Sequence, residues 1–225
     1  MRSLQPMITS NRASGRRRPL NNGAHQKLSN QDLTADLQRA FAFASRLHAT
    51  QTRKGTSTPY ISHLMAVAAL VLEHGGDRDQ AIAALLHDSI EDQGHDYPGG
   101  VTALRATIKA EFGARVLEIV EACTDAETLP KPPWRERKEQ YIAHLNHVPP
   151  DVLLVSCADK LHNARTIVTD LRSIGSAVFD RFTGGKEGTL WYYRSLVETF
   201  ARRGPGLHHE LERVVQEMEA LARSS

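Results

Sequence analysis

Several features that mark other protein classes are scarce or missing in this chain of 225 residues. Cysteine occurs twice, and the spacing of Cys123 and Cys157 along the sequence fits no metal-binding motif, so we expect free thiols in a core. Such thiols suit a reducing compartment, and we expect a cytoplasmic protein. No run of 18 apolar residues is present, so we expect neither a transmembrane helix nor a membrane partner.

Acidic residues are missing from the first 30 positions, which carry six Lys and Arg side chains. This segment is rich in Asn, Ser and Gly, and it lacks the continuous apolar core of a signal peptide. We therefore expect residues 1–30 to form a disordered basic tail and residues 31–225 to form one domain. Contact between the tail and nucleic acid is the less favoured alternative, and the sequence does not indicate an oligomeric state.

Convincing strand patterns and internal repeats are missing too, whereas apolar residues recur at helical spacing, for example over residues 33–47. A second helix is expected to begin at Thr58-Pro59 and to stop at Gly75-Gly76. Hydrophobic residues make up 40 % of the chain, which is enough for one core. We predict an all-α fold, a single bundle of about eight to ten helices, with the others at about residues 79–92, 101–111, 114–123, 134–147, 150–172, 186–203 and 207–223.

His63 falls in the first turns of the second predicted helix, which is apolar nearly all round and should therefore be central. An imidazole buried in such a helix needs a polar partner, because burying an unsatisfied polar group is costly. A metal ion is one candidate partner. A hydrogen bond to a neighbouring carbonyl group is the alternative.

The dipeptide His87-Asp88 directly follows the apolar residues 81–86, and Glu91 and Asp92 lie within one further turn. With 11 His and 12 Asp in the chain, about 0.6 His-Asp pairs are expected by chance, so the context matters more than the pair. On one continuous helix the four side chains would share a wedge of about 140°. A metal site and a solvated acidic helix end would both give this wedge.

A second pair, His95-Asp96, lies within the Gly- and Pro-rich residues 94–100. Clusters of Gly and Pro between periodic segments are typical of turns and loops. We therefore interpret this pair as part of a solvated loop rather than as a metal site.

Asp159 is a carboxylate within the apolar helical residues 152–166. A charge in such surroundings needs compensation, either from Lys160 or an arginine or from a metal ion. Asn163 and Thr166 follow at i+4 and i+7, so they share its helix face. Imidazole and carboxylate groups together form the ligand set of a borderline divalent ion such as Mn²⁺, Fe²⁺ or Zn²⁺.

Two basic segments are candidates for binding an anionic ligand. Residues 51–58 offer Arg53, which can stack on a base or bind phosphate with two donors, and Lys54, which supplies a point charge. An ordinary surface loop is the alternative. A second basic group lies near the start of a predicted helix: Arg135, Arg137 and Lys138. These side chains either hold phosphate groups or form the exposed start of that helix.

Three motifs, in this order, resemble the HD-superfamily hydrolase domain of RelA/SpoT homologs. They are Thr52-Arg53-Lys54-Gly55 with the following Pro59-Tyr60-Ile61-Ser62-His63, then residues 83–92, then residues 158–166. The resemblance covers roughly residues 33–200, and the stand-alone small alarmone hydrolases fit best. We expect no synthetase domain.

The resemblance implies a Mn²⁺-dependent enzyme that removes the 3′-pyrophosphate of (p)ppGpp or a related purine alarmone, a small-molecule substrate. It implies that one Mn²⁺ per chain is held by His63, His87, Asp88 and Asp159. The water and proton-transfer chemistry is implied to belong to Glu91 and Asp92. The implied substrate contacts are Arg53, Lys54, Asn163 and Thr166.

Two other functions stay open. The first is an HD phosphohydrolase that acts on another nucleotide, such as (p)ppApp, NADPH or a deoxynucleotide. The second is a binding protein, for instance an antitoxin that neutralises a toxic synthetase by contact. A degenerate binder would not need the four ligand residues together with Glu91 and Asp92, so their presence favours an enzyme.

Overall fold

Helices make up the regular structure of the computed structural model, which describes residues 30–125 and 130–224. The described part contains ten α-helices and one 3₁₀ helix, and its one strand-like pairing is an isolated bridge between Thr52 and Pro59. The predicted all-α class is therefore confirmed. The predicted disordered tail, residues 1–30, lies outside the described residues except for Asn30, which begins the first helix.

The helices lie close to their predicted positions, with two exceptions discussed below. The first six are α1 (Asn30–Leu47), α2 (Ile61–Glu73), α3 (Arg78–Leu86), α4 (Ser89–Gln93), α5 (Gly100–Phe112) and α6 (Ala114–Cys123). The remaining elements are α7 (Trp134–Leu145), α8 (Pro150–Ile174), the 3₁₀ helix η1 (Gly175–Arg181), α9 (Gly185–Arg203) and α10 (His208–Ser224). The 3₁₀ helix is not among the predicted elements. None of the described helices combines the length and apolar character needed to cross a membrane.

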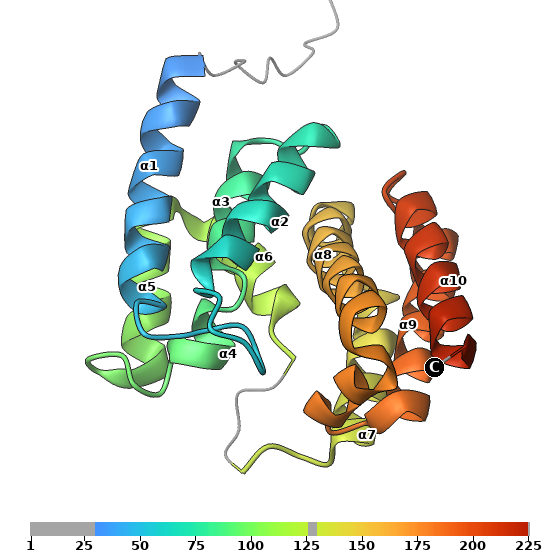
Figure 1. Ribbon diagram of the computed structural model, residues 1–225. Helices are drawn as coiled ribbons and strands as arrows, with labels where there is room; N and C mark the ends of the chain where they lie inside the picture. The colour runs from blue at the N-terminus through green and yellow to red at the C-terminus, as the bar shows by residue number, and fades with distance from the viewer. Residues whose placement is uncertain (1–29, 126–129, 225) are drawn as a thin grey trace, which may run out of the picture.

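The long helix α8 lies in the middle of the bundle (Figure 1). On one side it packs against α2, α3 and α6, and on the other it packs against η1, α9 and α10. Helix α1 packs on α3, and α5 packs on α6. The contact between α2, α3 and α8 therefore joins three distant parts of the sequence.

The apolar residues 81–86 form α3's buried centre, and each of these side chains is at most 4 % exposed. Helix α2 is less enclosed than its composition suggests, because Met65 is 48 % exposed and Leu72 is 37 % exposed. Helix α2 is therefore not enclosed on every side. Its face bearing His63 is nevertheless fully buried against the core.

The helix predicted at residues 79–92 is divided in two. A turn at His87-Asp88 separates α3 from α4. In this turn, Nδ1 of His87 donates a hydrogen bond to the carbonyl oxygen of Ala84 at 2.8 Å, which satisfies a carbonyl near the end of α3. The wedge calculated for a continuous helix is therefore wrong, and the turn sets the directions of His87 and Asp88.

The predicted start of α2 at Thr58-Pro59 is also wrong. The helix begins at Ile61, after Tyr60, whose side chain makes no capping bond. Thr58 instead closes the preceding loop, because its carbonyl oxygen accepts a hydrogen bond from the backbone N–H of Arg53 at 2.8 Å. This bond folds residues 51–58, which we call the basic loop, back beside the first turn of α2.

Candidate active site

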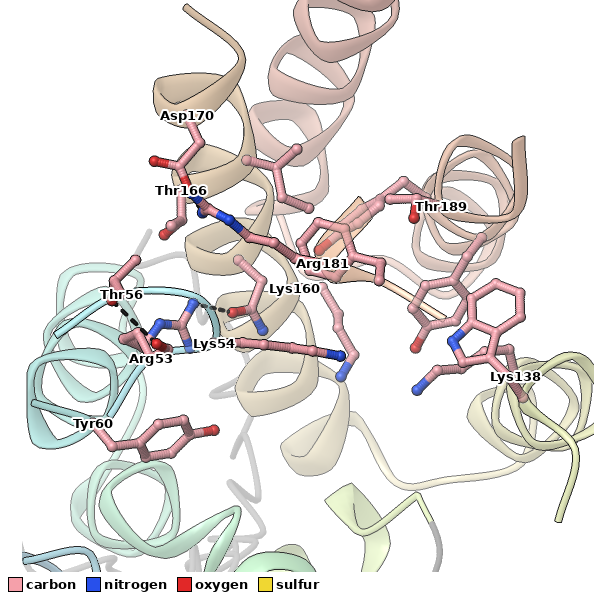
Figure 2. Close-up of a pocket in the computed structure, with 16 residues that line it drawn as sticks. Arg53, Lys54, Thr56, Tyr60, Lys138, Lys160, Thr166, Asp170, Arg181 and Thr189 are labelled. Carbon is pink, nitrogen blue, oxygen red and sulfur yellow. Dashed lines mark hydrogen bonds and ion pairs between the residues drawn. The ribbon is translucent and has the colours of Figure 1, made fainter. Parts of the chain in front are cut away.

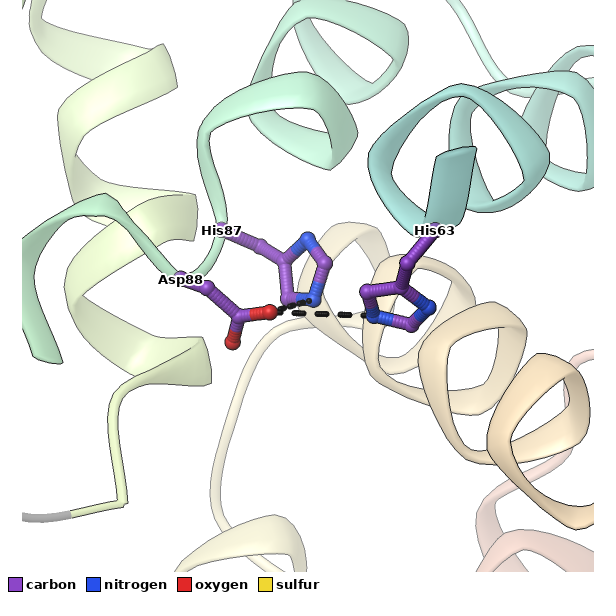
Figure 3. A group of neighbouring side chains, drawn as sticks. All are labelled: His63, His87 and Asp88. Atoms are coloured by element: carbon purple, nitrogen blue, oxygen red, sulfur yellow. Dashed lines mark ion pairs between the residues drawn. The ribbon is translucent and has the colours of Figure 1, made fainter. Parts of the chain in front are cut away.

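The turn at His87-Asp88 lies next to the start of α2 and brings three possible metal ligands together (Figure 3). The ligand atoms of His63, His87 and Asp88 lie within 4.8 Å of one another. Oδ2 of Asp88 is 2.9 Å from Nε2 of His87 and 3.7 Å from Nε2 of His63. Both imidazoles are buried, whereas Asp88 is partly exposed.

Asp159, in the middle of α8, approaches the same two imidazoles. Its Oδ1 atom lies 3.2 Å from Nε2 of His63 and 3.7 Å from Nε2 of His87. The tightest group consists of the other three residues, and Asp159 lies beside it. The structure thus gathers all four predicted ligands into one cluster, which we call the His-Asp cluster.

The donor atoms of the His-Asp cluster fit a divalent metal ion. The Nε2 atoms of His63 and His87 are buried and make no hydrogen bond to the described residues. Since Nδ1 of His87 donates to Ala84, its Nε2 atom is the nitrogen that would bind a metal ion. Two imidazole nitrogens and two carboxylates are a ligand set suited to ions such as Mn²⁺ or Zn²⁺.

The alternative in which His63 bonds to a carbonyl group is wrong. Nδ1 of His63 instead lies 2.7 Å from Nδ1 of His162, a side chain on α8. Burial lowers the pKa of His63, and burial also lowers the pKa of His162 to about 4. Both rings are therefore neutral near pH 7.

The charges of the His-Asp cluster are partly balanced by protein groups. Nζ of Lys160 lies 2.6 Å from Oδ2 of Asp159. Lys160 was one of the groups that the sequence offered to compensate the charge of Asp159. Burial would raise the pKa of Asp159, but Lys160 and the two imidazoles hold it well below its usual value. Burial would lower the pKa of His87, but Asp88 and Asp159 raise it well above its usual value. A proton on His87 thus offsets negative charge that a metal cation would also offset.

Glu91 and Asp92 lie on α4, one turn beyond Asp88. Oε1 of Glu91 pairs with Nζ of Lys131 at 2.7 Å, and Oδ2 of Asp92 accepts a hydrogen bond from Gln51 at 2.8 Å. Loss of solvation and the negative charge of Asp88 raise the pKa of Asp92 to about 6, although the residue stays open to solvent. Asp92 can therefore gain or lose a proton near neutral pH.

Figure 2 shows the side chains that line a cavity of about 330 Å³. Tyr60 lines the cavity, and its hydroxyl group donates a hydrogen bond to Oδ2 of Asp88 at 2.5 Å, which connects the cavity with the His-Asp cluster. All four predicted substrate contacts line this cavity: Arg53, Lys54, Asn163 and Thr166. The basic loop is therefore one wall of a cavity.

Hydrogen bonds link the basic loop directly to the His-Asp cluster. Nη2 of Arg53 donates to Oδ1 of Asn163 at 2.6 Å, and Nδ2 of Asn163 donates to Oδ1 of Asp159 at 2.5 Å. Asn163 thus orients a cavity side chain and a cluster carboxylate at the same time. The hydroxyl group of Thr166 donates to the carbonyl oxygen of His162 at 3.0 Å, so only its oxygen lone pairs remain to accept from a ligand.

The cavity contains further basic residues. Lys160 and Arg181 line it together with Lys138, whereas Asp170 is the one acidic side chain in its described wall. Lys138 belongs to the basic group noted in the sequence, while Arg135 of that group pairs with Glu139 on the surface at 2.7 Å. Arg181 comes from η1, and no sequence signal pointed to it. Lys138, Lys160 and Arg181 pair with Asp125, Asp159 and Asp170, so the positive charge that favours a polyanionic ligand comes mainly from Arg53 and Lys54.

Aromatic side chains form another part of the wall, and Trp134 is placed there by two glycines of the α9 region. A Cβ atom on Gly184 would lie 2.6 Å from the indole of Trp134, and one on Gly188 would lie 3.0 Å from it. The ring therefore needs both positions to lack a side chain. Tyr192 lies edge to face with Trp134, with ring centroids 6.3 Å apart. Rings of this kind can pack against a base or a sugar.

Comparison with known proteins identifies the family. The family model described as HD domain matches residues 40–190, a range that includes the whole His-Asp cluster. The chain belongs to the HD domain family. This confirms the resemblance inferred from the three sequence motifs.

The HD protein is similar to curated relatives from animals and bacteria. It is 40 % identical over 136 residues to the guanosine-3′,5′-bis(diphosphate) 3′-pyrophosphohydrolase MESH1 of Mus musculus, and the same holds for MESH1 of Homo sapiens. Each match covers 59 % of this chain and 70 % of the relative. A bacterial guanosine-3′,5′-bis(diphosphate) 3′-pyrophosphohydrolase, from Aquifex aeolicus, is 34 % identical over 132 residues, which is 18 % of that longer protein.

Two solved structures share the fold. The first is a metazoan ortholog of SpoT, described as hydrolysing ppGpp, with a TM-score of 0.66 and 23 % identity over 81 % of this chain and 95 % of that chain. The second is a protein from Listeria monocytogenes, with a TM-score of 0.58 and 27 % identity over 68 % of this chain and 96 % of that one. The arrangement of helices is therefore shared with these two solved structures.

Proposed function

We propose that this HD protein is a metal-dependent hydrolase that removes the 3′-pyrophosphate of (p)ppGpp or a related purine alarmone. The observation that carries the proposal is the contact between the His-Asp cluster and a basic, aromatic cavity. A cluster of this kind can act on a phosphoryl group, and the cavity can hold the remaining phosphates and the base. The MESH1 relatives carry the name of this activity.

His63, His87, Asp88 and Asp159 would hold one divalent ion per chain, and we propose Mn²⁺. When bound, the ion supplies a water molecule of lowered pKa and neutralises phosphate charge. The protein keeps the carboxylates in place through Tyr60 and Asn163, which donate hydrogen bonds to Asp88 and Asp159. Lys160 offsets the buried charge of Asp159.

The cavity side chains would divide the substrate between them. The guanidinium of Arg53 donates a hydrogen bond to Asn163, and its central carbon lies 5.7 Å from the centroid of the Tyr60 ring. A purine can stack on a guanidinium plane. Lys54 lies at the exposed side of the same loop, where it can meet the 3′-phosphates. Lys138 and Arg181, which also line the cavity, can meet the 5′-phosphates.

Hydrolysis breaks the bond between phosphorus and the 3′-oxygen and forms a bond between phosphorus and the water oxygen. The water gives up a proton, and the 3′-oxygen gains one, so the products are pyrophosphate and GDP or GTP. Glu91, which pairs with Lys131, would orient the water and accept its proton. Asp92, whose pKa is raised to about 6 by desolvation and Asp88, can deliver a proton to the 3′-oxygen.

The test is product analysis with the purified full chain, Mn²⁺ and a panel of nucleotides. We expect pyrophosphate and a nucleotide with a free 3′-hydroxyl group from (p)ppGpp or (p)ppApp. Release of single phosphates from NADPH, with no pyrophosphate from either alarmone, would replace the alarmone proposal by the wider phosphohydrolase one. No turnover of any nucleotide, together with binding to an alarmone synthetase, would favour the binding-protein alternative.

Three further expectations accompany this proposal. We propose that residues 31–225 form one HD-type domain. We propose that the tail of residues 1–30 takes no part in the reaction. We also propose that the protein is located in the cytoplasm. Deleting residues 1–30 should therefore leave the rate of pyrophosphate release unchanged, and a loss of turnover would assign the tail a part in the reaction.

Arg53→Ala is expected to raise KM by about ten- to hundredfold and to lower kcat much less, because a charge-assisted contact to substrate is lost in ground state and transition state alike. Steady-state kinetics on the preferred alarmone measures both constants. Arg39→Ala is the matched control, since Arg39 is an exposed arginine on α1 that pairs with Asp36. A fall in kcat at unchanged KM would contradict the assignment of Arg53 to binding.

Gly184→Ala is expected to displace the indole of Trp134, because the backbone at Gly184 accepts alanine but the new Cβ would lie 2.6 Å from the ring. Tryptophan fluorescence should change, and KM should rise by up to about tenfold as the cavity wall moves. Gly206→Ala is the control, since a Cβ there meets no atom within 4 Å. A changed fluorescence with an unchanged KM in Gly184→Ala would exclude Trp134 from the substrate site.

A further inference from the structure

His162 lies on α8 beside the His-Asp cluster and is neither a proposed ligand nor a proposed substrate contact. Its Nδ1 atom is 2.7 Å from Nδ1 of His63, and the two ring centroids are 4.8 Å apart. His63 itself is fully buried, so its ring can find few other partners. His162 therefore contacts the Nδ1 side of the His63 ring, whereas the carboxylates approach its Nε2 side.

Two ring nitrogens at hydrogen-bond distance share one proton, so one of them donates and the other accepts. His63 can offer the Nε2 lone pair to a metal only if its own proton is on Nδ1. Nδ1 of His63 must then donate, and Nδ1 of His162 must accept. The proton of neutral His162 is consequently on its Nε2 atom.

The other cluster residues obtain their orientation differently. Nδ1 of His87 donates to the carbonyl oxygen of Ala84, and a carbonyl can only accept, so the backbone alone fixes the tautomer of His87. Asp88 receives its hydrogen bond from Tyr60. His63 is the one imidazole of the cluster whose tautomer depends on a side chain, and that side chain can be replaced by mutation.

We propose that His162 is a positioning residue for the metal site, which accepts the Nδ1 proton of His63 and so directs the Nε2 lone pair of His63 into the His-Asp cluster. The inference rests on the proposed function in one respect, namely that His63 is a metal ligand. Partners of this kind fix both the tautomer and the ring direction of a ligating histidine, and their loss typically weakens metal binding by about 10- to 100-fold.

The test compares Mn²⁺ binding to the metal-free full-length protein and its variants, without any nucleotide. His162→Ala removes the acceptor and should weaken Mn²⁺ binding by about 10- to 100-fold. His162→Asn puts an accepting oxygen close to the former Nδ1 position, so it should restore most of the affinity. His144→Ala is the matched control, because His144 is an exposed histidine on α7 that bonds to the carbonyl oxygen of Ala122.

Thermal unfolding of the metal-free forms separates positioning from a structural role. If His162 only fills space, His162→Ala should lower the unfolding temperature, and His162→Asn should not recover Mn²⁺ affinity. If His162→Ala does not fold, the Mn²⁺ affinities of His162→Asn and His162→Gln are compared instead. The Gln side chain is one methylene longer, so its oxygen lies farther from the former Nδ1 position. Tighter Mn²⁺ binding by the Asn variant than by the Gln variant supports the proposal. Equal Mn²⁺ affinities of His162→Ala and the unaltered protein, or of His162→Asn and His162→Gln, overturn the proposal. No Mn²⁺ binding by the unaltered protein would instead overturn the proposed metal site, and this inference with it.

Discussion

His87→Ala is expected to abolish stoichiometric Mn²⁺ binding and to lower the rate of pyrophosphate release by more than about 100-fold. The physical reason is that His87 contributes a buried nitrogen that faces both cluster carboxylates, 2.9 Å from Asp88 and 3.7 Å from Asp159. Without this imidazole, two carboxylates and one histidine remain in the cluster. Elemental analysis of the purified variant, together with its turnover rate, measures the effect.

The chain offers a matched control in its second His-Asp pair. His95 and Asp96 lie exposed in the turn between α4 and α5, as the sequence predicted. His95→Ala should bind Mn²⁺ and turn over substrate as the unaltered protein does. Full metal occupancy in His87→Ala would rule out His87 as a ligand, and a loss of metal in both variants would place the ion elsewhere.

Glu91→Gln is expected to keep the fold and the Mn²⁺ affinity while kcat falls by about 10²- to 10⁴-fold, as the loss of a general acid–base would cause. Glu91 lies one turn beyond the His-Asp cluster and is not a proposed ligand, so the amide should disturb the water chemistry rather than the metal. The ion pair with Lys131 is also lost, at a cost of at most about 1 kcal/mol of stability. Metal titration, thermal unfolding and steady-state kinetics on one preparation give the three quantities.

Glu139→Gln is the control for this change, because Glu139 is an exposed glutamate on α7 whose ion pair with Arg135 lies on the surface. It should leave kcat unaltered. Parental turnover in Glu91→Gln, with normal Mn²⁺ binding, would reduce Glu91 to a helix-end carboxylate paired with Lys131. The proton transfer would then be assigned to Asp92 alone.

The direction of the cluster residues could not be obtained from the sequence. Residues 81–86 were predictable as buried helix because a continuous apolar run must be enclosed on every side. The break at His87-Asp88 has no such signal, since neither residue ends a helix by itself. It depends on local bonding such as that between His87 and Ala84, and on packing between α3, α2 and α8.

The substrate cavity was predictable only in part. Arg53 and Asn163 were both predicted contacts, yet their hydrogen bond joins positions 110 residues apart and exists because α2 packs against α8. Arg181 and Trp134 left no interpretable signal. Arg181 reaches the cavity because Gly55, with φ of +73°, brings the basic loop against its side chain, and Trp134 reaches it because Gly184 leaves room for the indole.

The sequence by itself determined the all-α class, the HD family and the identity of the charged groups that apolar helices would bury. These follow from local periodicity and from the cost of burying ionisable side chains, which limits where they can occur. Only the tertiary structure decided that His63, His87, Asp88 and Asp159 meet at one point, that Lys160 offsets the charge of Asp159 and that His162 lies against Nδ1 of His63. Most of these are distances between helices far apart in the chain, and the packing of those helices sets them.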